Sequence, residues 1–291
     1  MRVLVTGAAG FVGRATTAAL TQAGHEVVAL DSRPLTGPGV ITVVADVRDT
    51  ASLVGLGRRL GVEAVVHLAS PLMDRAEADP ALGVSVITGG MVSVLQLSRA
   101  QGIRLVWASS IAVFAAATGP VGDASAPRPG NIYGIAKSCC ENLADHWGRR
   151  GWCASLGLRF PVVYGRGRVD GPTAFLGRLL AQADGDPPVE LPRGDLKMCF
   201  QHVSDTVAYL LRGLEVPVTG SRTLNTPGDV KEVIEAVELV KAVRPGVRTL
   251  PTDAVVELPW DIRCEGIEAL LGPIEPLSLP RGIRRSLASD A

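Results

Sequence analysis

A glycine triplet near the start of the chain has the spacing that a dinucleotide site requires. Gly7, Gly10 and Gly13 follow the apolar run 3–6 and precede an alanine-rich stretch, 14–23, that is typical of a helix. Glycine permits a tight turn, lets the backbone approach a pyrophosphate, and lets the helix pack closely on the strand. Strand, glycine turn and helix in this order indicate that phosphates bind at the helix start.

Tyr133 and Lys137 have the spacing of a proton-transfer pair. They are four residues apart at the start of a predicted helix, 134–149, so both side chains project from one face. A free phenol is a poor base near neutral pH, but a nearby ammonium stabilises the phenolate. Tyr133 could then remove a hydroxyl proton while hydride leaves the same carbon, or act in reverse. The alternative is an incidental pair on an amphipathic helix.

An acidic residue follows the second predicted strand. Residues 26–30 form that strand and Asp31 stands at its end, about 20 residues beyond the glycines. A carboxylate there can accept the ribose hydroxyls of adenosine and repels a 2′-phosphate, which favours NAD. Arg33 could pair with a 2′-phosphate, so NADP stays open. A simple turn residue before Pro34 is the other interpretation of Asp31.

Serines end the fifth predicted strand, where doubly wound sheets bind ligands. Ser109 and Ser110 follow Trp107 and Ala108. A hydroxyl at this edge could orient a substrate oxygen, or it could cap a helix.

The elements that must position these residues alternate up to about residue 165. The strands are apolar on both faces, as buried parallel strands are, and the helices between them act as crossovers. The pattern therefore predicts an α/β fold with a Rossmann-type doubly wound parallel sheet. The predicted strands are 3–6, 26–30, 41–44, 64–68, 105–108 and 154–158, and the further predicted helices are 52–60 and 84–101.

The second half of the chain is richer in glycine and proline, with short elements between loops. We expect an NAD(P)-binding Rossmann domain over residues 1–165 and a smaller, irregular substrate-binding lobe over 166–291. Residues 196–215 are expected to return to the first domain. Loops on a rigid scaffold often carry specificity.

Composition limits the possible partners. Lysine plus arginine and aspartate plus glutamate number 29 each, so neither nucleic acid nor an anionic membrane is expected to bind. The chain starts directly with a predicted strand, so no signal peptide is expected, and no apolar run is expected to approach the roughly 20 residues that span a bilayer. The five cysteines and four histidines have no metal spacing. These features predict a cytoplasmic protein with reduced thiols and no metal site.

Several motifs in a fixed order carry a family resemblance. They include the run 6–13, Asp31, 45–47, 67–69, Ser109-Ser110, Tyr133 with Lys137, 158–165 and 200–205. Together they resemble an extended short-chain dehydrogenase/reductase of the NAD-dependent epimerase/dehydratase type, over residues 1 to about 215. The resemblance implies Ser110, Tyr133 and Lys137 as catalytic residues, with Ser109 a weaker candidate than Ser110. It also implies that Lys137 holds the nicotinamide ribose.

The resemblance also implies which residues bind the ligands. The cofactor residues are Gly7, Ala9, Gly10, Phe11, Val12, Gly13, Asp31, Ser32, Arg33, Asp46, Val47, Leu68, Ala69, Ser70, Ala108, Ser109, Tyr133, Lys137, Phe160, Pro161 and Val163. The substrate residues are Ser70, Met73, Ser110, Ile111, Tyr133, Arg166 and Phe175. Phe114, Met198 and Phe200 are further apolar pocket candidates, and Arg168 joins Arg166 as a handle for an anion. Both arginines could instead belong to a solvated loop.

Departures from the family pattern narrow the expected activity. Ile111 and Ala112 stand where dehydratases of the family carry an acidic pair, so dehydration is not expected. Val162 and Met198 replace the asparagine and arginine that commonly hold a nucleotide diphosphate. The asparagine usual in the fourth helix is also missing, which leaves a water relay in doubt.

The expected function is NAD(P)-dependent hydride transfer to or from a hydroxyl or carbonyl carbon of a small non-nucleotide substrate. A sugar acid and a natural-product ketone both fit. A nucleotide-sugar epimerase or 4-ketoreductase is one alternative, and a non-catalytic NAD(P)-binding regulator is another. Because relatives pair the helices corresponding to 92–100 and 135–149, and both have apolar positions at helical spacing, a homodimer is expected.

Overall fold

The computed structural model describes residues 1–37 and 39–288. Its main sheet has seven strands in the order β10-β6-β5-β4-β1-β2-β3, and every neighbouring pair is parallel. The strands are β1 (Arg2–Thr6), β2 (Glu26–Asp31), β3 (Val40–Val44), β4 (Ala64–His67), β5 (Arg104–Ser110), β6 (Ser155–Phe160) and β10 (Ser221–Asn225). The predicted α/β fold with a doubly wound parallel sheet is confirmed.

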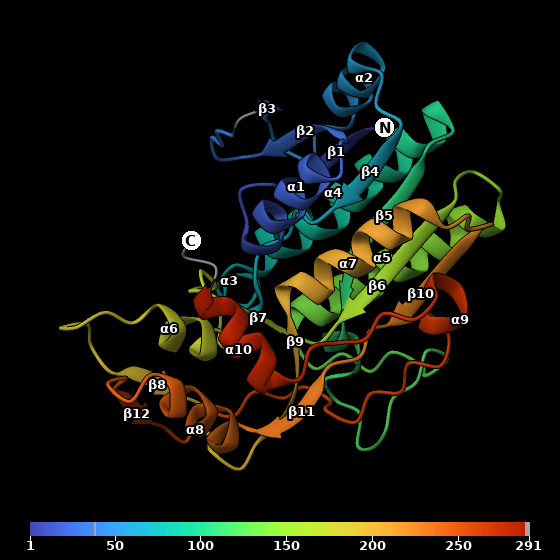
Figure 1. Cartoon of the computed structure of the whole chain (residues 1–291). Coiled ribbons are helices and arrows are strands. Elements are labelled where there is room, and N and C mark those ends of the chain that lie inside the picture. The colour runs from blue at the N-terminus through green and yellow to red at the C-terminus, as the bar shows by residue number, and fades with distance from the viewer. Residues whose placement is uncertain (38, 289–291) are drawn as a thin grey trace.

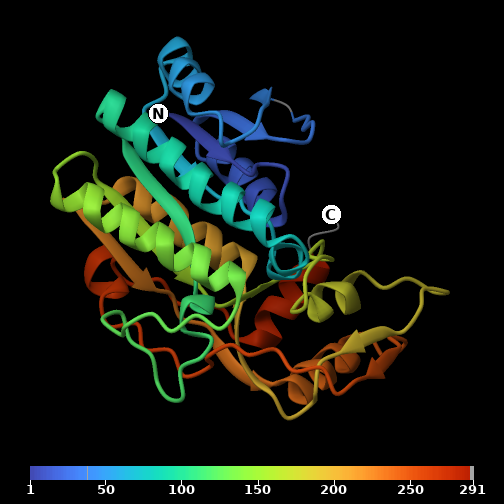
Figure 2. The same cartoon turned by 180° about the vertical axis from the view of Figure 1, so that it is seen from behind.

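Helices cover both faces of this sheet (Figures 1 and 2). One face carries α1 (Phe11–Gln22) and α7 (Val203–Glu215), and the other carries α2 (Thr50–Leu60), α4 (Pro80–Gln101) and α5 (Ile132–Arg149). Successive strand residues enter opposite cores: Val3 and Val5 lie in the cluster beneath α1 and α7, whereas Leu4 lies in the cluster beneath α2 and α4. Burial on both faces explains why the strands are continuously apolar.

Side-chain and glycine caps set the helix boundaries. Asp49 accepts a hydrogen bond from the Ser52 backbone at the start of α2, and Asp79 accepts one from the Leu82 backbone at the start of α4. Gly102 ends α4 in the left-handed conformation, with φ of 65°. Because Asp79 caps it, α4 begins four residues before the predicted start at residue 84.

A smaller lobe forms a separate layer, at the bottom of Figure 1. Its main sheet contains β7 (Val162–Tyr164), β9 (Lys197–His202) and β11 (Asp229–Glu232), in the order β11-β9-β7. The other elements are β8 (Val189–Leu191), β12 (Thr249–Pro251), α6 (Phe175–Ala181), α8 (Val233–Val243) and α10 (Leu279–Ala288). Three short helices lie elsewhere, namely α3 (Met73–Ala78), the 3₁₀ helix η1 (Ile111–Phe114) and α9 (Ile267–Leu271).

The chain divides between the two parts differently from the predicted boundary. Residues 221–225, which are predicted to lie in the lobe, form β10 and pair with β6 at the edge of the main sheet. Of the segment 196–215, α7 packs on the main sheet, whereas β9 pairs within the lobe. Strand β10 is not predicted from the sequence because its first three residues, Ser221, Arg222 and Thr223, are polar, so the strand lacks an apolar run.

Helix α4 is long and apolar enough to cross a membrane by length and composition, contrary to the prediction that no apolar run approaches that length. Its 22 residues pack against α2 and α5, and half of its most apolar window is buried. Burial of this kind is also found in core helices, so the helix is weak evidence for a membrane span.

Candidate active site

The glycine turn between β1 and α1 leaves no room for side chains. Gly7 has a φ of 70°, and a Cβ atom there would lie 2.6 Å from the backbone nitrogen of Ala69. A Cβ atom on Gly13 would lie 2.1 Å from the carbonyl oxygen of Gly7. The N-cap of α1 is Gly10, which has no side chain to cap the helix. The backbone at the start of α1 can therefore approach a phosphate closely.

Asp31, at the end of β2, is hydrogen-bonded to this turn. One carboxylate oxygen accepts a hydrogen bond from the backbone N–H of Ala9 at 2.9 Å, and the other accepts one from the backbone N–H of Arg33 at 3.0 Å. The Arg33 guanidinium lies 3.5 Å from the same carboxylate. Asp31 thus links the glycine turn to the β2–β3 connection.

The start of α5 brings Tyr133 against the end of β5. Asn131 caps the helix by accepting a hydrogen bond from the Gly134 backbone at 2.8 Å. A Cβ atom on Gly134 would lie 2.3 Å from the carbonyl oxygen of Ala112. Only glycine permits this close approach, so Gly134 lets the helix carrying Tyr133 dock beside Ser110 and η1.

Lys137 lies beneath Tyr133 and is almost fully buried. Its Nζ donates a hydrogen bond to the carbonyl oxygen of Ala108 at 2.8 Å and lies 5.6 Å from the centre of the Tyr133 ring. An ammonium held at this distance can stabilise a phenolate. The predicted Tyr133/Lys137 pair is therefore brought together by the fold.

The two serines at the end of β5 have different partners. Ser110 faces the cavity, and its Oγ accepts a hydrogen bond from the Ala112 backbone at 3.1 Å. Ser109 donates a hydrogen bond to Glu141 Oε1 at 2.6 Å. Since the Ser110 hydroxyl keeps its proton available, Ser110 is the better group to orient a substrate oxygen.

One cavity of about 760 Å³ joins these features at the carboxyl ends of the strands. Its position is the one at which doubly wound sheets bind ligands. The predicted residues that line it are Gly7, Ala9, Gly10, Phe11, Val12, Gly13, Arg33, Leu68, Ser70, Met73, Ala108, Ser109, Ser110, Ile111, Tyr133, Lys137, Phe160, Pro161, Val163, Arg166 and Arg168.

Five predicted cofactor residues do not line this cavity, namely Asp31, Ser32, Asp46, Val47 and Ala69. Asp46 is instead hydrogen-bonded to the Arg48 side chain at 3.0 Å, and the Arg48 guanidinium holds the pKa of that carboxyl below its ordinary value. Val47 is buried under α4, where a Cβ atom on Gly90 would lie 2.9 Å from it.

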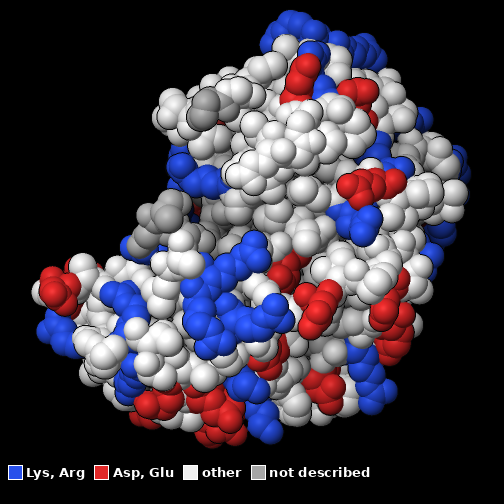
Figure 3. All heavy atoms as spheres, in the orientation of Figure 1, with Lys and Arg blue, Asp and Glu red and all other residues white. Residues whose placement is uncertain are grey.

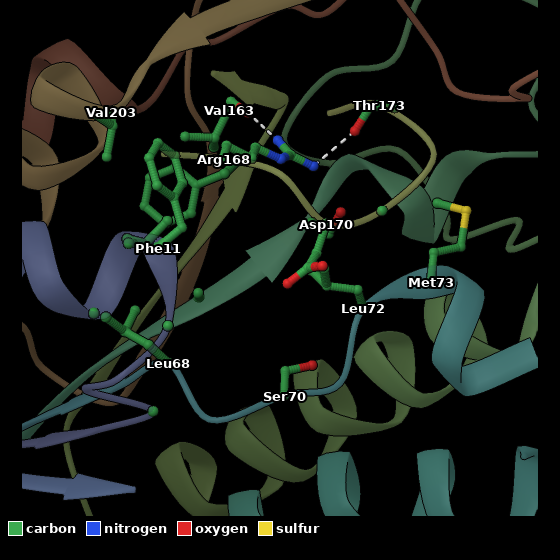
Figure 4. Close-up of a pocket in the computed structure, with 18 of the residues that line it drawn as sticks. Phe11, Leu68, Ser70, Leu72, Met73, Val163, Arg168, Asp170, Thr173 and Val203 are labelled. Carbon is green, nitrogen blue, oxygen red and sulfur yellow. Dashed lines mark hydrogen bonds between the residues drawn. The ribbon is translucent and has the colours of Figure 1, made fainter. Parts of the chain in front are cut away.

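Arg168 enters the cavity from the loop after β7 (Figure 4). Its guanidinium donates hydrogen bonds to the Val163 carbonyl oxygen and, at 2.7 Å, to Thr173 Oγ1. Burial lowers the pKa of Arg168 to about 10, and the nearby Tyr133 phenol opposes that shift. Within the described residues Arg168 has no carboxylate partner in an ion pair, although it stays charged at neutral pH.

The loop that carries Arg168 is held in place by α6. Arg178 donates hydrogen bonds to the carbonyl oxygens of Val169, at 2.8 Å, and Gly171, at 3.3 Å. Asp170, on the same loop, points into the cavity (Figure 4). The solvated-loop interpretation of Arg168 is therefore wrong, because its side chain is tied into the cavity wall.

The prediction that Phe114, Phe175, Met198 and Phe200 line the pocket is wrong, because none of them lines the cavity. Phe175 and Phe200 are 1% and 0% exposed and pack on each other in the lobe core, with ring centres 6.1 Å apart. Met198 belongs to the same core. Phe114 lies under the Arg159 guanidinium, 4.7 Å from it. Phe175, Met198 and Phe200 occupy inward positions of the lobe's helix and strand, whereas Phe114 on η1 packs in a separate buried cluster with Val113 and Val121.

Other lining residues were missed by the sequence analysis. Arg14 lies in the first turn of α1, Arg75 lies on α3, and Leu258 comes from a loop far along the chain. Helical spacing after Gly10 could have indicated Arg14. Nothing in the sequence indicates that Leu258 reaches this cavity.

Basic side chains also gather outside the cavity. Figure 3 shows Lys and Arg over the region of α10, beside the hollow between the main sheet and the lobe. This helix contributes Arg281, Arg284 and Arg285. A positive surface beside a cavity raises the local concentration of anionic ligands.

Comparison with known proteins identifies the family. Residues 3–225 match the model of the NAD dependent epimerase/dehydratase family. The chain belongs to this family. The predicted resemblance is confirmed, and the matched region ends with β10, the last strand of the main sheet.

Individual relatives differ in their activities. The chain is 30% identical to UDP-glucuronate 4-epimerase 3 of Arabidopsis thaliana, over 73% of this chain but only 54% of that protein. It is 24% identical to D-erythronate dehydrogenase of Haemophilus influenzae, over 83% of this chain and 82% of the relative. The chain thus spans about half the length of the epimerase but most of the dehydrogenase.

A solved structure is similar over its whole length. MoeE5 in complex with UDP-glucuronic acid and NAD superposes with a TM-score of 0.87 and 28% identity, covering 99% of this chain and 98% of that one. The small lobe is therefore shared as well as the nucleotide-binding sheet.

Proposed function

We propose that this protein is an NAD-dependent dehydrogenase that transfers hydride to or from a small, non-nucleotide hydroxy acid or ketone. One observation carries the proposal: a single cavity contains the glycine turn at one end and Ser110, Tyr133 and Lys137 at the other. A cofactor bound on the turn would reach the residues that can move a proton.

The residues fit a dinucleotide. A Cβ atom at Gly7 or Gly13 would clash with the neighbouring backbone, so the turn requires glycine at both positions. A turn without side chains lets a pyrophosphate pass close to the backbone. Lys137 would hold the nicotinamide ribose, and the Asp31 carboxylate favours NAD over NADP at the adenosine end. The bound NAD in MoeE5 supports the same choice.

The chain's own residues supply the proton transfer. Tyr133 removes the substrate hydroxyl proton during oxidation and returns it during reduction, while Ser110 orients the same oxygen. Lys137 stabilises the phenolate from beneath. The cofactor, when bound, supplies or accepts the hydride.

An anionic substrate suits Arg168, whose guanidinium is hydrogen-bonded to Val163 and Thr173 but meets no carboxylate in an ion pair among the described residues. A buried cation is costly unless it meets an anion, and Arg168 lies near Tyr133 within the cavity. A carboxylate on the substrate would pair with it, which favours a sugar acid over a neutral ketone. The D-erythronate dehydrogenase relative supports this class.

Nucleotide-sugar epimerisation is the second candidate, because UDP-glucuronate also carries a carboxylate and the epimerase and MoeE5 are similar to this chain. Against it, Val162 and Met198 are 3% exposed, so neither position offers a polar group to a diphosphate. A charge-assisted hydrogen bond of that kind is worth roughly 1.5–3 kcal/mol.

A substrate panel separates the candidates. The protein is mixed with NAD and with D-erythronate, L-arabinose or UDP-glucuronate, and absorbance of the reduced nicotinamide is followed. We expect a rise with D-erythronate. Conversion of UDP-glucuronate to its 4-epimer without net reduction would establish the epimerase instead. NAD binding without turnover of a wider panel of hydroxy acids and ketones would point to a regulatory protein.

We also propose a homodimer through α4 and α5, which pack side by side on one face of the sheet (Figure 2). Apolar side chains project outward from both helices, with Val84 38% and Ile135 49% exposed. Light scattering at micromolar concentration should give twice the chain mass. Ile135→Arg should give monomers, whereas Ile234→Arg on α8, at a similarly exposed position, should not. A monomeric parent protein would contradict the proposal.

A further inference from the structure

A buried ion pair joins α5 to the main sheet beneath the reacting residues. Arg159 on β6 donates hydrogen bonds from Nε to Glu141 Oε1 and from Nη2 to Glu141 Oε2, both at 2.8 Å. The two side chains are only 6% and 8% exposed. Ser109 on β5 donates a third hydrogen bond to Glu141 Oε1, at 2.6 Å. Glu141 therefore connects one helix to two neighbouring strands.

Arg159 is held on its other side as well. Its Nη1 donates hydrogen bonds to the Asp123 carbonyl oxygen at 3.0 Å and to Asn225 Oδ1 at 3.3 Å. The guanidinium also lies 4.7 Å from the centre of the Phe114 ring. These contacts fix the guanidinium, so Glu141 meets a rigid partner rather than a mobile one.

The pair sets the register between α5 and β5. Tyr133, Lys137 and Glu141 follow one another at intervals of four residues, on one face of the helix. Lys137 bonds to Ala108 and Glu141 bonds to Ser109. Helix α5 is thus attached to two consecutive residues of β5, and the next residue along the strand is Ser110.

We propose that Glu141 and Arg159 are positioning residues that fix the geometry between Tyr133 and Ser110, and that Arg159 cancels the charge that Glu141 would place beneath Lys137. The proposal rests on the proposed dehydrogenase function, since it assigns a role in the same proton transfer. Neither residue lines the cavity, so both act through others.

Charge at Glu141 is close enough to affect the phenol. Eight residues of helix span about 12 Å, and at an effective dielectric constant of about 20 one unit charge at that distance shifts a titration by about one pH unit. The other groups around Tyr133 stay unchanged in the variants below. Those that line the cavity with Tyr133 are Arg75 on α3, Lys137 on α5, and Arg166, Arg168 and Asp170 on the loop after β7. Glu77 on α3 accepts a hydrogen bond from the Ile132 backbone, and His67 on β4 is kept neutral by burial.

Two substitutions separate charge from position. Glu141→Asp keeps the charge but shortens the side chain, so kcat should fall roughly 10–100-fold while the pH of half-maximal oxidation stays fixed. Glu141→Gln keeps the length but leaves the Arg159 charge uncancelled. The added positive charge favours the phenolate, so the half-maximal pH should move down by about one unit. Both variants should keep the parent Kd for NAD.

Control variants distinguish a specific role of Glu141 from a general effect of removing a carboxylate. Glu238→Gln, at an exposed position on α8, should change neither kcat nor the pH profile. If Glu141→Gln fails to fold, Ser109→Ala can be used instead, because it removes one hydrogen bond to Glu141 without a change of charge. In Ser109→Ala, kcat should fall while the pH profile stays fixed. Ser109→Thr, which keeps a hydroxyl, should have a higher kcat than Ser109→Ala.

An unshifted pH profile in Glu141→Gln would overturn the charge role. Parent kcat in Glu141→Asp and Ser109→Ala would overturn the positioning role. Parent turnover is measured in the same assay, so failure of the dehydrogenase function itself would be seen before any variant is compared.

Discussion

Lys137 on α5 donates a hydrogen bond from Nζ to the carbonyl oxygen of Ala108 on β5, at 2.8 Å. This bond points the ammonium of a nearly buried lysine toward the carboxyl end of β5, beneath Tyr133. The same bond ties the helix that carries the proton donor to the strand that carries Ser110. The hydrogen bond between Lys137 and Ala108 therefore both positions Tyr133 relative to Ser110 and places a positive charge beneath the phenol.

The close docking of α5 predicts that Gly134→Ala is damaging. The new Cβ atom would lie 2.3 Å from the Ala112 carbonyl oxygen, so α5 must shift away from η1. We expect a loss of stability of about 1–3 kcal/mol, measured by denaturant unfolding, and a lower kcat. The control is Gly55→Ala on α2, where nothing lies within 4 Å. Parent stability and kcat in Gly134→Ala would show that the contact is not limiting.

Asp31 is predicted to determine cofactor choice. Asp31→Ala removes the acceptor of the Ala9 and Arg33 backbone bonds and frees the Arg33 guanidinium to pair with a 2′-phosphate. Affinity for NAD should fall by about tenfold or more, while affinity for NADP rises relative to NAD. Fluorescence titration with both cofactors measures the change. A parent protein that already prefers NADP would mean that Arg33 governs the choice.

Arg168 is predicted to hold the anionic end of the substrate. Arg168→Met should raise KM for D-erythronate by roughly 10–100-fold, because a charge-assisted bond is worth about 1.5–3 kcal/mol. Kinetics with the neutral sugar L-arabinose serve as the comparison, since a sugar without a carboxylate loses no such bond. An equal loss on both substrates would indicate that Arg168 only supports the loop through Val163 and Thr173.

Two buried histidines predict instability in acid. Burial, aided by the Lys137 ammonium, lowers the pKa of His67 to about 3, and burial, aided by Arg285, lowers that of His202 to about 4. An unfolded histidine titrates near 6.5. Between these values the unfolded chain binds more protons, so stability is full above about pH 6.5 and falls as the pH drops.

The size of this effect can be measured at pH 5. Each histidine should remove on the order of 2 kcal/mol there relative to pH 7.5, because the two pH values lie on either side of the unfolded pKa. Denaturant unfolding at both pH values gives the difference. His202→Asn should reduce it, with His25→Asn, at a half-buried position near the N-terminus, as the control. A difference that His202→Asn leaves unchanged would assign the acid sensitivity to other groups.

The local parts of the site could be predicted from the sequence. The Gly7 turn and the Tyr133/Lys137 pair depend on neighbouring residues, since a glycine turn and a helical spacing of four are set by backbone geometry. The alternation of apolar strands with helices likewise predicts the doubly wound sheet. Strand β10 was missed because an edge strand does not need to be apolar on both faces.

The parts that depend on distant contacts could not be predicted. Phe175 has the apolar character of a pocket residue, and only the packing of the lobe shows that it faces Phe200 instead. Glu141 stands one helical turn after Lys137, which places it on the reacting face of α5. Its partner Arg159 lies on another strand, however, and no local pattern joins the two.

The central claim is that Tyr133 transfers the proton, and Tyr133→Phe tests it most directly. This substitution removes only the hydroxyl and leaves the glycine turn intact, so the Kd for NAD should stay within a few-fold of the parent value. The rate on the best substrate should fall by about 10²–10⁴-fold, which is the usual contribution of general acid–base catalysis. A Tyr133→Phe variant that turns over within a few-fold of the parent would contradict the account.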